Sequence, residues 1–296
     1  MTVAQAAGAR GTFRQAAADY VSLTKPGIVS LLVATALAAM IAAAHGRPSL
    51  LAVLAVLVGG SLAAGGAHAI NCWFDRDIDA LMTRTRRRPI PEGRIPAWHA
   101  LAIGVGFNVF AFWLLAAYAN LLAAGLTLLA TLIYVFVYTI WLKRATPQNI
   151  VIGGAAGAIP PLVGWAAVTG RLDLTAISLF LVIFLWTPPH FWALAQMVAR
   201  DYREAGVPMM PVVRSDAFTK RQSFGYAIAT VAVSLVPFFT GAVGPVYLAG
   251  AIGLGAGLLA VTGLDLKGRR WTAALFAYSI GYMALLFAFL ALGAVL

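Results

Sequence analysis

The chain has 296 residues, of which 61% are hydrophobic and 10% are charged, whereas soluble domains are about 45–50% apolar and about 25% charged. Its mean hydropathy is +0.87. This composition excludes a soluble enzyme and a disordered protein, and the single cysteine excludes an internal disulfide or a metal site built from several cysteines. We expect an all-α polytopic membrane protein, because this length accommodates roughly nine or ten spanning helices.

Apolar runs separated by glycine and proline predict nine spans in chain order. They lie near residues 27–45, 50–74, 98–118, 120–141, 147–168, 174–198, 222–241, 244–263 and 271–295. Residues 1–24 form an Ala-rich N-terminal segment that lacks the apolar core of a signal peptide and suits a short interfacial helix. Residues 25–296 are expected to form one transmembrane domain, whose first helix follows the cap-like Thr24 and begins at Pro26.

The basic residues are distributed unevenly between the two sides of these spans. Nineteen of the 21 lysines and arginines lie in the N-terminal segment or after the second, fourth, sixth and eighth spans, and only Arg47 and Arg171 lie elsewhere. By the positive-inside rule the N-terminus is cytoplasmic and, with nine spans, the C-terminus lies outside. The net charge of +11 therefore reflects topology, and no nucleic-acid partner is expected.

Acidic residues gather at the cytoplasmic end of the second span. Asn71, Asp75 and Asp79 are spaced i, i+4 and i+8, so they stack on one helix face, whereas Asp77 lies off that face by more than about 90°. Carboxylate and amide oxygens suit Mg²⁺, which often bridges to phosphate. The spacing therefore favours a magnesium site at this helix end.

An arginine-rich run follows this acidic face. It comprises Arg84, Arg86, Arg87 and Arg88. Guanidinium groups bind phosphate oxygens through paired hydrogen bonds, so a metal face beside arginines suits a bound diphosphate. The plainer alternative is a membrane anchor, with the acids simply paired to Arg76, Arg84 and Arg88.

A second candidate acid, Asp201, opens the cytoplasmic segment 199–221, with Glu204 as its i+3 neighbour. A solvated helix end is the alternative for both acids. Two of the four histidines lie away from the ends of their spans, where an ionisable side chain is costly and often functional. His68 precedes Asn71 by one turn, and His190 follows two prolines that we expect to open its helix. The eleven residues between His190 and Asp201 predict one shared face, with hydrogen bonds between helices as the alternative role for either histidine.

Taken together, these motifs resemble those of the UbiA superfamily of intramembrane prenyltransferases. Residues 71–79 with Arg84 and Arg88 resemble its first aspartate-rich motif, and Tyr138 with residues 143–144 resembles the signature after its fourth helix. Further stretches resemble the branch of the superfamily that acts on haem; these are residues 23–26, 186–193 and 201–208. The resemblance covers roughly residues 20–295.

The resemblance implies nine helices around a central cavity, Mg²⁺ as cofactor and a prenyl diphosphate held between two acidic motifs. The implied metal ligands are Asn71, Asp75 and Asp79, and the implied catalytic carboxylates are Asp75, Asp79 and Asp201. The implied diphosphate-binding residues are Arg84, Arg88, Lys143 and Arg144. This chain departs from the pattern at Ala205, where the second motif commonly has an acid, so a second Mg²⁺ site would need Glu204 instead.

The implied reaction transfers farnesyl from farnesyl diphosphate to the 2-vinyl group of haem B, giving haem O for terminal oxidases. It would take place in the inner (plasma) membrane of a bacterium. His68 and His190 are then candidate haem contacts, and haem A synthase or a terminal oxidase are candidate partners.

Two other functions remain open from the sequence. One is a prenyltransferase whose acceptor is an aromatic acid or a chlorophyllide, which the Pro188 to Trp192 run disfavours. The other is a transporter of Mg²⁺ or organic cations. Transporters place ion sites near the bilayer midplane, whereas these acids lie at span ends beside arginines.

Overall fold

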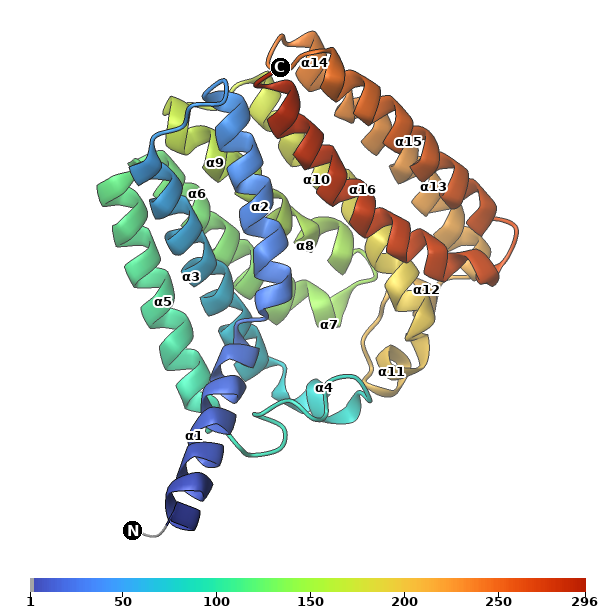
Figure 1. Cartoon of the computed structure of the whole chain (residues 1–296). Helices are drawn as coiled ribbons and strands as arrows, with labels where there is room; N and C mark the ends of the chain where they lie inside the picture. Colours follow the sequence, from blue (N-terminus) through green and yellow to red (C-terminus); the bar gives the residue numbers. More distant parts are fainter. Residues whose placement is uncertain (1–2) are drawn as a thin grey trace.

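The chain folds as a bundle of helices, seen in a computed structural model that describes residues 3–296, with side chains from residue 12 onward (Figure 1). Throughout residues 3–296, every regular element is helical, and nine spans are long and apolar enough to cross a bilayer. The predicted fold class is therefore confirmed: this is a multi-pass membrane protein.

Five of the nine spans each consist of a single helix. These are α2 (Pro26–Ala43), α3 (Leu50–Phe74), α5 (Ala97–Tyr118), α10 (Leu174–Met197) and α15 (Pro245–Asp265). The other four are built from consecutive pieces: α6 (Leu121–Leu132), the π-helix η1 (Ile133–Leu142) and α7 (Lys143–Ala145); α8 (Asn149–Ala158) and α9 (Pro160–Thr169); α13 (Asp216–Ser234) and α14 (Val236–Phe239); η2 (Arg269–Trp271) and α16 (Thr272–Gly293).

The first described residues and the C-terminus lie at opposite ends of the bundle, as an odd number of spans requires (Figure 1). At one end lie α1 (Val3–Leu23), α4 (Arg76–Leu81) and α11 (Ala199–Glu204), together with α12 (Met210–Val213). We call this the acidic end. Asp19 of α1 accepts a hydrogen bond from Arg94 Nε at 2.9 Å, which ties α1 to the segment between α4 and α5.

Small residues let neighbouring spans approach closely. A Cβ atom added at Gly104 of α5 would lie 2.7 Å from the Gly66 carbonyl oxygen of α3, and one added at Gly164 of α9 would lie 2.1 Å from the Ala36 carbonyl oxygen of α2. Association of helices in lipid depends on such close packing. At these points the backbones of α3 and α5, and of α2 and α9, lie in close contact.

The segment between the sixth and seventh spans ends earlier than expected. We predicted a segment reaching residue 221, but α13 begins at Asp216 because the Ser215 hydroxyl accepts the Phe218 N–H at 3.2 Å as an N-cap. Lys220 is therefore helical and buried, and its Nζ lies 3.1 Å from Oδ1 of Asp265 on α15.

The expectation that prolines open the sixth span is not met. Pro188 and Pro189 lie inside α10, which stays helical from Leu174 to Met197. Both prolines are buried, and proline is tolerated inside a spanning helix where surrounding groups satisfy the backbone carbonyls that it frees. The single continuous helix assumed in placing His190 and Asp201 on one face is not present, because α10 ends at Met197 and Asp201 belongs to the separate helix α11.

Candidate active site

The acidic face forms as its spacing predicts. Asp75 separates α3 from α4, yet the helical repeat continues, because Asp75 N–H donates to the Asn71 carbonyl at 2.9 Å and Asp79 N–H donates to that of Asp75 at 2.8 Å. The exposed fractions of Asn71, Asp75 and Asp79 are 4%, 1% and 2%. The Asp77 side chain is 59% exposed, so it points away from the buried face.

Each member of the acidic face contacts a basic side chain from another segment. Arg88 Nη1 lies 2.6 Å from Asp79 Oδ2, Lys143 pairs with Asp75, and Lys25 Nζ donates to Asn71 Oδ1 at 2.9 Å. Three cations thus meet two carboxylates. Because the positive charge is in excess, the cluster suits an anion that binds together with a metal ion. It disfavours a cation that binds without an anion.

A π-helix in the fourth span sets the partners of α3. Its turns are wider than those of an α-helix, and the Lys143 N–H donates to the Tyr138 carbonyl five residues earlier. Along this helix Tyr134 contacts His68, Thr139 accepts from Asn71 Nδ2 at 3.2 Å, and Lys143 pairs with Asp75. π-helical turns are frequent at functional sites, and this one aligns three polar side chains with one face of α3.

The side chains of the adjacent residues Lys143 and Arg144 point to different carboxylates. Lys143 faces the buried carboxylate of Asp75, whereas Arg144 donates two hydrogen bonds of 2.7 Å to the exposed Asp77. These hydrogen bonds lower the pKa of Asp77 to about 2. Arg144 also approaches Asp75 Oδ1 at 3.7 Å, so it lies at the rim of the acidic face.

The two acidic segments meet at this end of the bundle. The backbone N–H of Arg84 donates to Asp201 Oδ2 at 3.3 Å. Buried apolar side chains hold the segments together; they include Ile78, Met82, Ile150, Tyr202, Val207 and Met209. Glu204 is exposed and pairs with Arg200 at 2.6 Å, so it does not take the place that Ala205 leaves without an acid.

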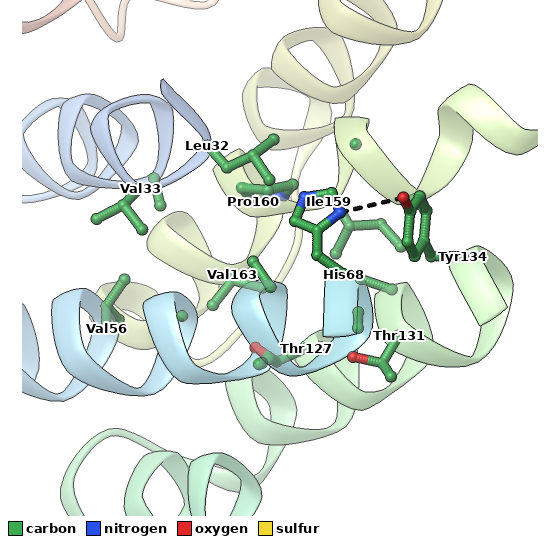
Figure 2. Close-up of a pocket in the computed structure, with 18 residues that line it drawn as sticks. Leu32, Val33, Val56, His68, Thr127, Thr131, Tyr134, Ile159, Pro160 and Val163 are labelled. Carbon is green, nitrogen blue, oxygen red and sulfur yellow. Dashed lines mark hydrogen bonds between the residues drawn. The ribbon is translucent and has the colours of Figure 1, made fainter. Parts of the chain in front are cut away.

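An apolar cavity runs along α3 (Figure 2), and its lining residue His68 lies three residues before Asn71 of the acidic face. Its lining comes from α2, α3, α6, η1, α8 and α9, and its polar side chains are Thr127, Thr131, Tyr134 and His68. His68 Nδ1 lies 3.1 Å from the Tyr134 hydroxyl, the dashed contact in Figure 2. From Val56 to His68 the cavity follows α3 for about 18 Å at the helical rise of 1.5 Å per residue. The cavity therefore provides an apolar compartment next to the charged acidic face.

His190 lies between helices and does not line this cavity. Its Nδ1 is 2.7 Å from the Ser279 hydroxyl of α16, and its ring stacks between Trp186 and Phe276 with centroid distances of 4.3 and 5.0 Å. These contacts match the alternative role of a hydrogen bond between helices. His68 is the histidine that the cavity brings next to the acidic face.

The residues of the acidic face fit Mg²⁺ accompanied by a diphosphate. Asp75 Oδ1 is buried and accepts no hydrogen bond from the residues described, so it has a lone pair available for a cation. Within that same part of the chain, no three His, Cys, Asp or Glu side chains form a group able to hold a metal by themselves. Mg²⁺ commonly takes only one or two carboxylates and completes its shell with water and phosphate, which matches Asp75 and Asp79.

Arg88→Lys is expected to raise the KM for a diphosphate substrate roughly tenfold, because lysine keeps the charge but loses the paired N–H donors. Arg88 is half-buried against Asp79, whereas Arg86 is exposed, so Arg86→Lys serves as the control and should leave KM unchanged. Steady-state kinetics on both variants provide the check. If both substitutions are silent, the arginine run is only a membrane anchor.

Comparisons with known proteins agree with this geometry. Residues 32–280 match the model of the UbiA prenyltransferase family; the chain belongs to this family. Relatives named protoheme IX farnesyltransferase include one from Gloeobacter violaceus, 53% identical over 91% of this chain and 89% of its own length. One from Roseiflexus sp. is 53% identical over 91% of this chain, which spans only about half (51%) of that relative.

Solved structures share the fold at low sequence identity. One from work on digeranylgeranylglyceryl phosphate synthase has a TM-score of 0.79 and 18% identity, covering 95% of this chain and 99% of its own. A UbiA homologue from Archaeoglobus fulgidus bound to DMAPP and Mg²⁺ has a TM-score of 0.65 and 18% identity, covering 92% and 99%. These similarities confirm the UbiA fold.

Sequence reasoning missed three polar side chains of the site. Lys25 was interpreted as part of a helix start, as a topology-setting charge and as part of the stretch 23–26, but it is itself the N-cap residue of α2 and reaches Asn71. Tyr134 and Thr139 were not singled out; a 3.6-residue period places Tyr134 about 180° from Lys143, although it places Thr139 on the face of Lys143 at a spacing of four residues. The signal for Lys25 was a lysine directly before a helix-starting proline, within reach of the acidic end.

Proposed function

We propose that this chain transfers the farnesyl group of farnesyl diphosphate to the 2-vinyl group of haem B, giving haem O and diphosphate. The observation that carries the proposal is the juxtaposition of the acidic face and its cations with the apolar cavity. The activity for which its close relatives are named supports the choice of substrates.

The charged compartment suits the diphosphate. We assign Asn71, Asp75 and Asp79 to Mg²⁺, which when bound would neutralise charge on the departing diphosphate. Arg88 and Lys143 lie at this face and would hold phosphate oxygens, while Arg84 and Asp201 connect it to the second segment. Arg144 would act from the rim.

The reaction breaks the bond between C1 of the farnesyl chain and the diphosphate oxygen, and the electron pair leaves with the diphosphate. The terminal carbon of the haem vinyl group then bonds to C1, and water adds to the inner vinyl carbon with loss of a proton. No nucleophilic serine or cysteine is needed, because the vinyl group is itself the nucleophile. The chain's part is to stabilise the leaving group and to keep the allylic chain in an apolar compartment.

The excess of basic side chains at the acidic face also argues against cation transport as the function. A bare Mg²⁺ or organic cation would meet Lys25, Arg88 and Lys143 at the acidic face and would bind there only weakly. We propose further that the acidic end faces the cytoplasm of a bacterium, with the N-terminus inside and the C-terminus outside. Residues 25–296 would form a single domain preceded by segment 1–24, and haem A synthase or a terminal oxidase would be assembly partners.

Product analysis tests the proposed function. The purified full chain, given haem B, farnesyl diphosphate and Mg²⁺, should form a product with the mass of haem O, and chelation of Mg²⁺ should abolish it. With 4-hydroxybenzoate in place of haem B, no prenylated product is expected. Prenylation of 4-hydroxybenzoate would instead identify an aromatic-acid acceptor, and Mg²⁺ uptake into proteoliposomes without diphosphate would identify a transporter.

Gly157→Leu is expected to lower kcat/KM for farnesyl diphosphate about tenfold or more. Gly157 lines the cavity, and a Cβ added there meets open space, so a leucine side chain would occupy volume needed by the prenyl chain, at about 0.8 kcal/mol per displaced CH₂ group. Geranyl diphosphate, one isoprene unit shorter, should be affected less.

Gly106→Leu is the matched control, because Gly106 is exposed on α5, outside the cavity lining, and its Cβ position is also open. Kinetics with both diphosphates measure the effect. Equal losses for the two chain lengths would show that the prenyl chain does not occupy this cavity.

A further inference from the structure

Lys25 adopts a backbone conformation that is unfavourable for its residue type. Its φ and ψ are 50° and 61°, in the left-handed region, and it directly precedes Pro26. Non-glycine residues are uncommon there, and such conformations persist only where the surroundings impose them. The imposed conformation places Lys25 at the joint of α1 and α2, from which its Nζ reaches Asn71 Oδ1 at 2.9 Å.

Lys25 determines which way the Asn71 amide faces. A lysine ammonium only donates hydrogen bonds and a carboxylate only accepts them. The Asn71 oxygen therefore faces Lys25, and its Nδ2 donates to Asp75 Oδ2 at 2.6 Å and to Thr139 Oγ1 at 3.2 Å. The oxygen that would serve a metal is thus already held by an ammonium group of the chain itself.

Charge indicates what happens when the substrate arrives. Mg²⁺ bound through Asn71 Oδ1 would have to displace the Lys25 ammonium, which could not remain in contact with the same oxygen beside a divalent cation. A diphosphate brought with Mg²⁺ provides several anionic oxygens at the same place. The ammonium can therefore exchange one oxygen acceptor for another without losing a charge-assisted hydrogen bond.

We propose that Lys25 holds the Asn71 oxygen in the free site and binds the diphosphate once Mg²⁺ takes that oxygen. Lys25 is then a positioning residue before substrate binds and a diphosphate-binding residue afterwards. This inference rests on the proposed function only in requiring a diphosphate substrate; it does not depend on which acceptor is prenylated.

Lys25→Met separates the two roles, because it should not lower the affinity for a metal ion but should lower the affinity for pyrophosphate. Methionine keeps most of the side-chain length without the charge, so the competitor for Asn71 Oδ1 is removed together with the diphosphate ligand. The affinity for Mn²⁺ alone, measured by EPR on the detergent-solubilised full chain, should be unchanged or higher. The affinity for inorganic pyrophosphate in saturating Mg²⁺, measured by calorimetry, should fall roughly 10- to 150-fold.

Two further variants complete the experiment. Lys267→Met removes an exposed lysine and should change neither affinity. Lys25→Gly gives the same two results as Lys25→Met and is expected to fold at least as well, because glycine adopts the left-handed conformation without strain; it decides the question if the methionine variant does not fold.

The proposal would be overturned if the Lys25 variants bound pyrophosphate as tightly as the wild type. It would also be overturned if they lost Mn²⁺ and pyrophosphate affinity equally, because that result indicates a general structural role. The binding experiment does not involve haem. A wild-type chain that shows the expected binding pattern but forms no farnesylated haem would contradict the proposed function and leave the role of Lys25 supported.

Discussion

Asp75→Asn is expected to lower turnover by more than about a hundredfold, and Asp79→Asn should do the same. Loss of groups that merely support a metal ligand already costs about 10–100-fold, and these carboxylates are assigned to the metal itself. Both are buried and paired with cations. Their neutralisation leaves Lys143 or Arg88 facing an uncharged amide, which should also destabilise the fold by up to about 3–5 kcal/mol.

Asp77→Asn is the matched control. Asp77 lies in the same turn of helix, but its side chain is exposed and pairs with Arg144 at the surface. An exposed pair contributes about 0–1 kcal/mol, so turnover should fall by less than about fivefold. Initial rates normalised to folded protein, with Tm recorded for each variant, measure the contrast. Similar losses at all three aspartates would contradict the assignment of the buried face to the metal.

Lys143→Met is expected to weaken binding of pyrophosphate in saturating Mg²⁺ by roughly 10- to 150-fold, because a charge-assisted hydrogen bond to a phosphate oxygen is lost. The Lys143 side chain is 12% exposed and contacts Asp75 directly. The ammonium is therefore on the buried side of the face, where a bound diphosphate would be shielded from water.

Arg144→Met tests the neighbouring position. Arg144 is bound mainly to Asp77 at the rim, so this variant should weaken pyrophosphate binding by less than about fivefold. Calorimetry on both variants gives the ratio. If Arg144→Met is the more damaging of the two, the diphosphate binds at the rim and not on the buried face.

The spans and the acidic face were predictable from sequence because both depend on local repetition. A run of about 20 apolar residues must be helical in lipid, since its backbone groups have no other partners. Within a helix, a spacing of four residues is enough to place Asn71, Asp75 and Asp79 together and Asp77 apart. The burial of the first three and the exposure of Asp77 follow directly from that period.

Partner choice at the site could not be predicted in this way. Lys143 and Arg144 are adjacent in sequence but pair with different carboxylates, and only the packing of the fourth span against α3 and α4 decides which of them faces the buried Asp75. Lys25 belongs to a joint whose left-handed backbone no local pattern indicated. Glu204 remained exposed because α11 turns it outward to Arg200.

The sequence alone determined that this protein is a nine-span helical bundle with a buried acidic face near the end of its second span, because helical period and hydrophobicity act within each segment. Tertiary structure decided which cations face that acidic face, that the apolar cavity runs from it along α3, and that His68 borders the cavity while His190 packs against α16. These features depend on how helices distant in sequence pack together, and close approach at residues such as Gly66, Gly104 and Gly164 sets that packing.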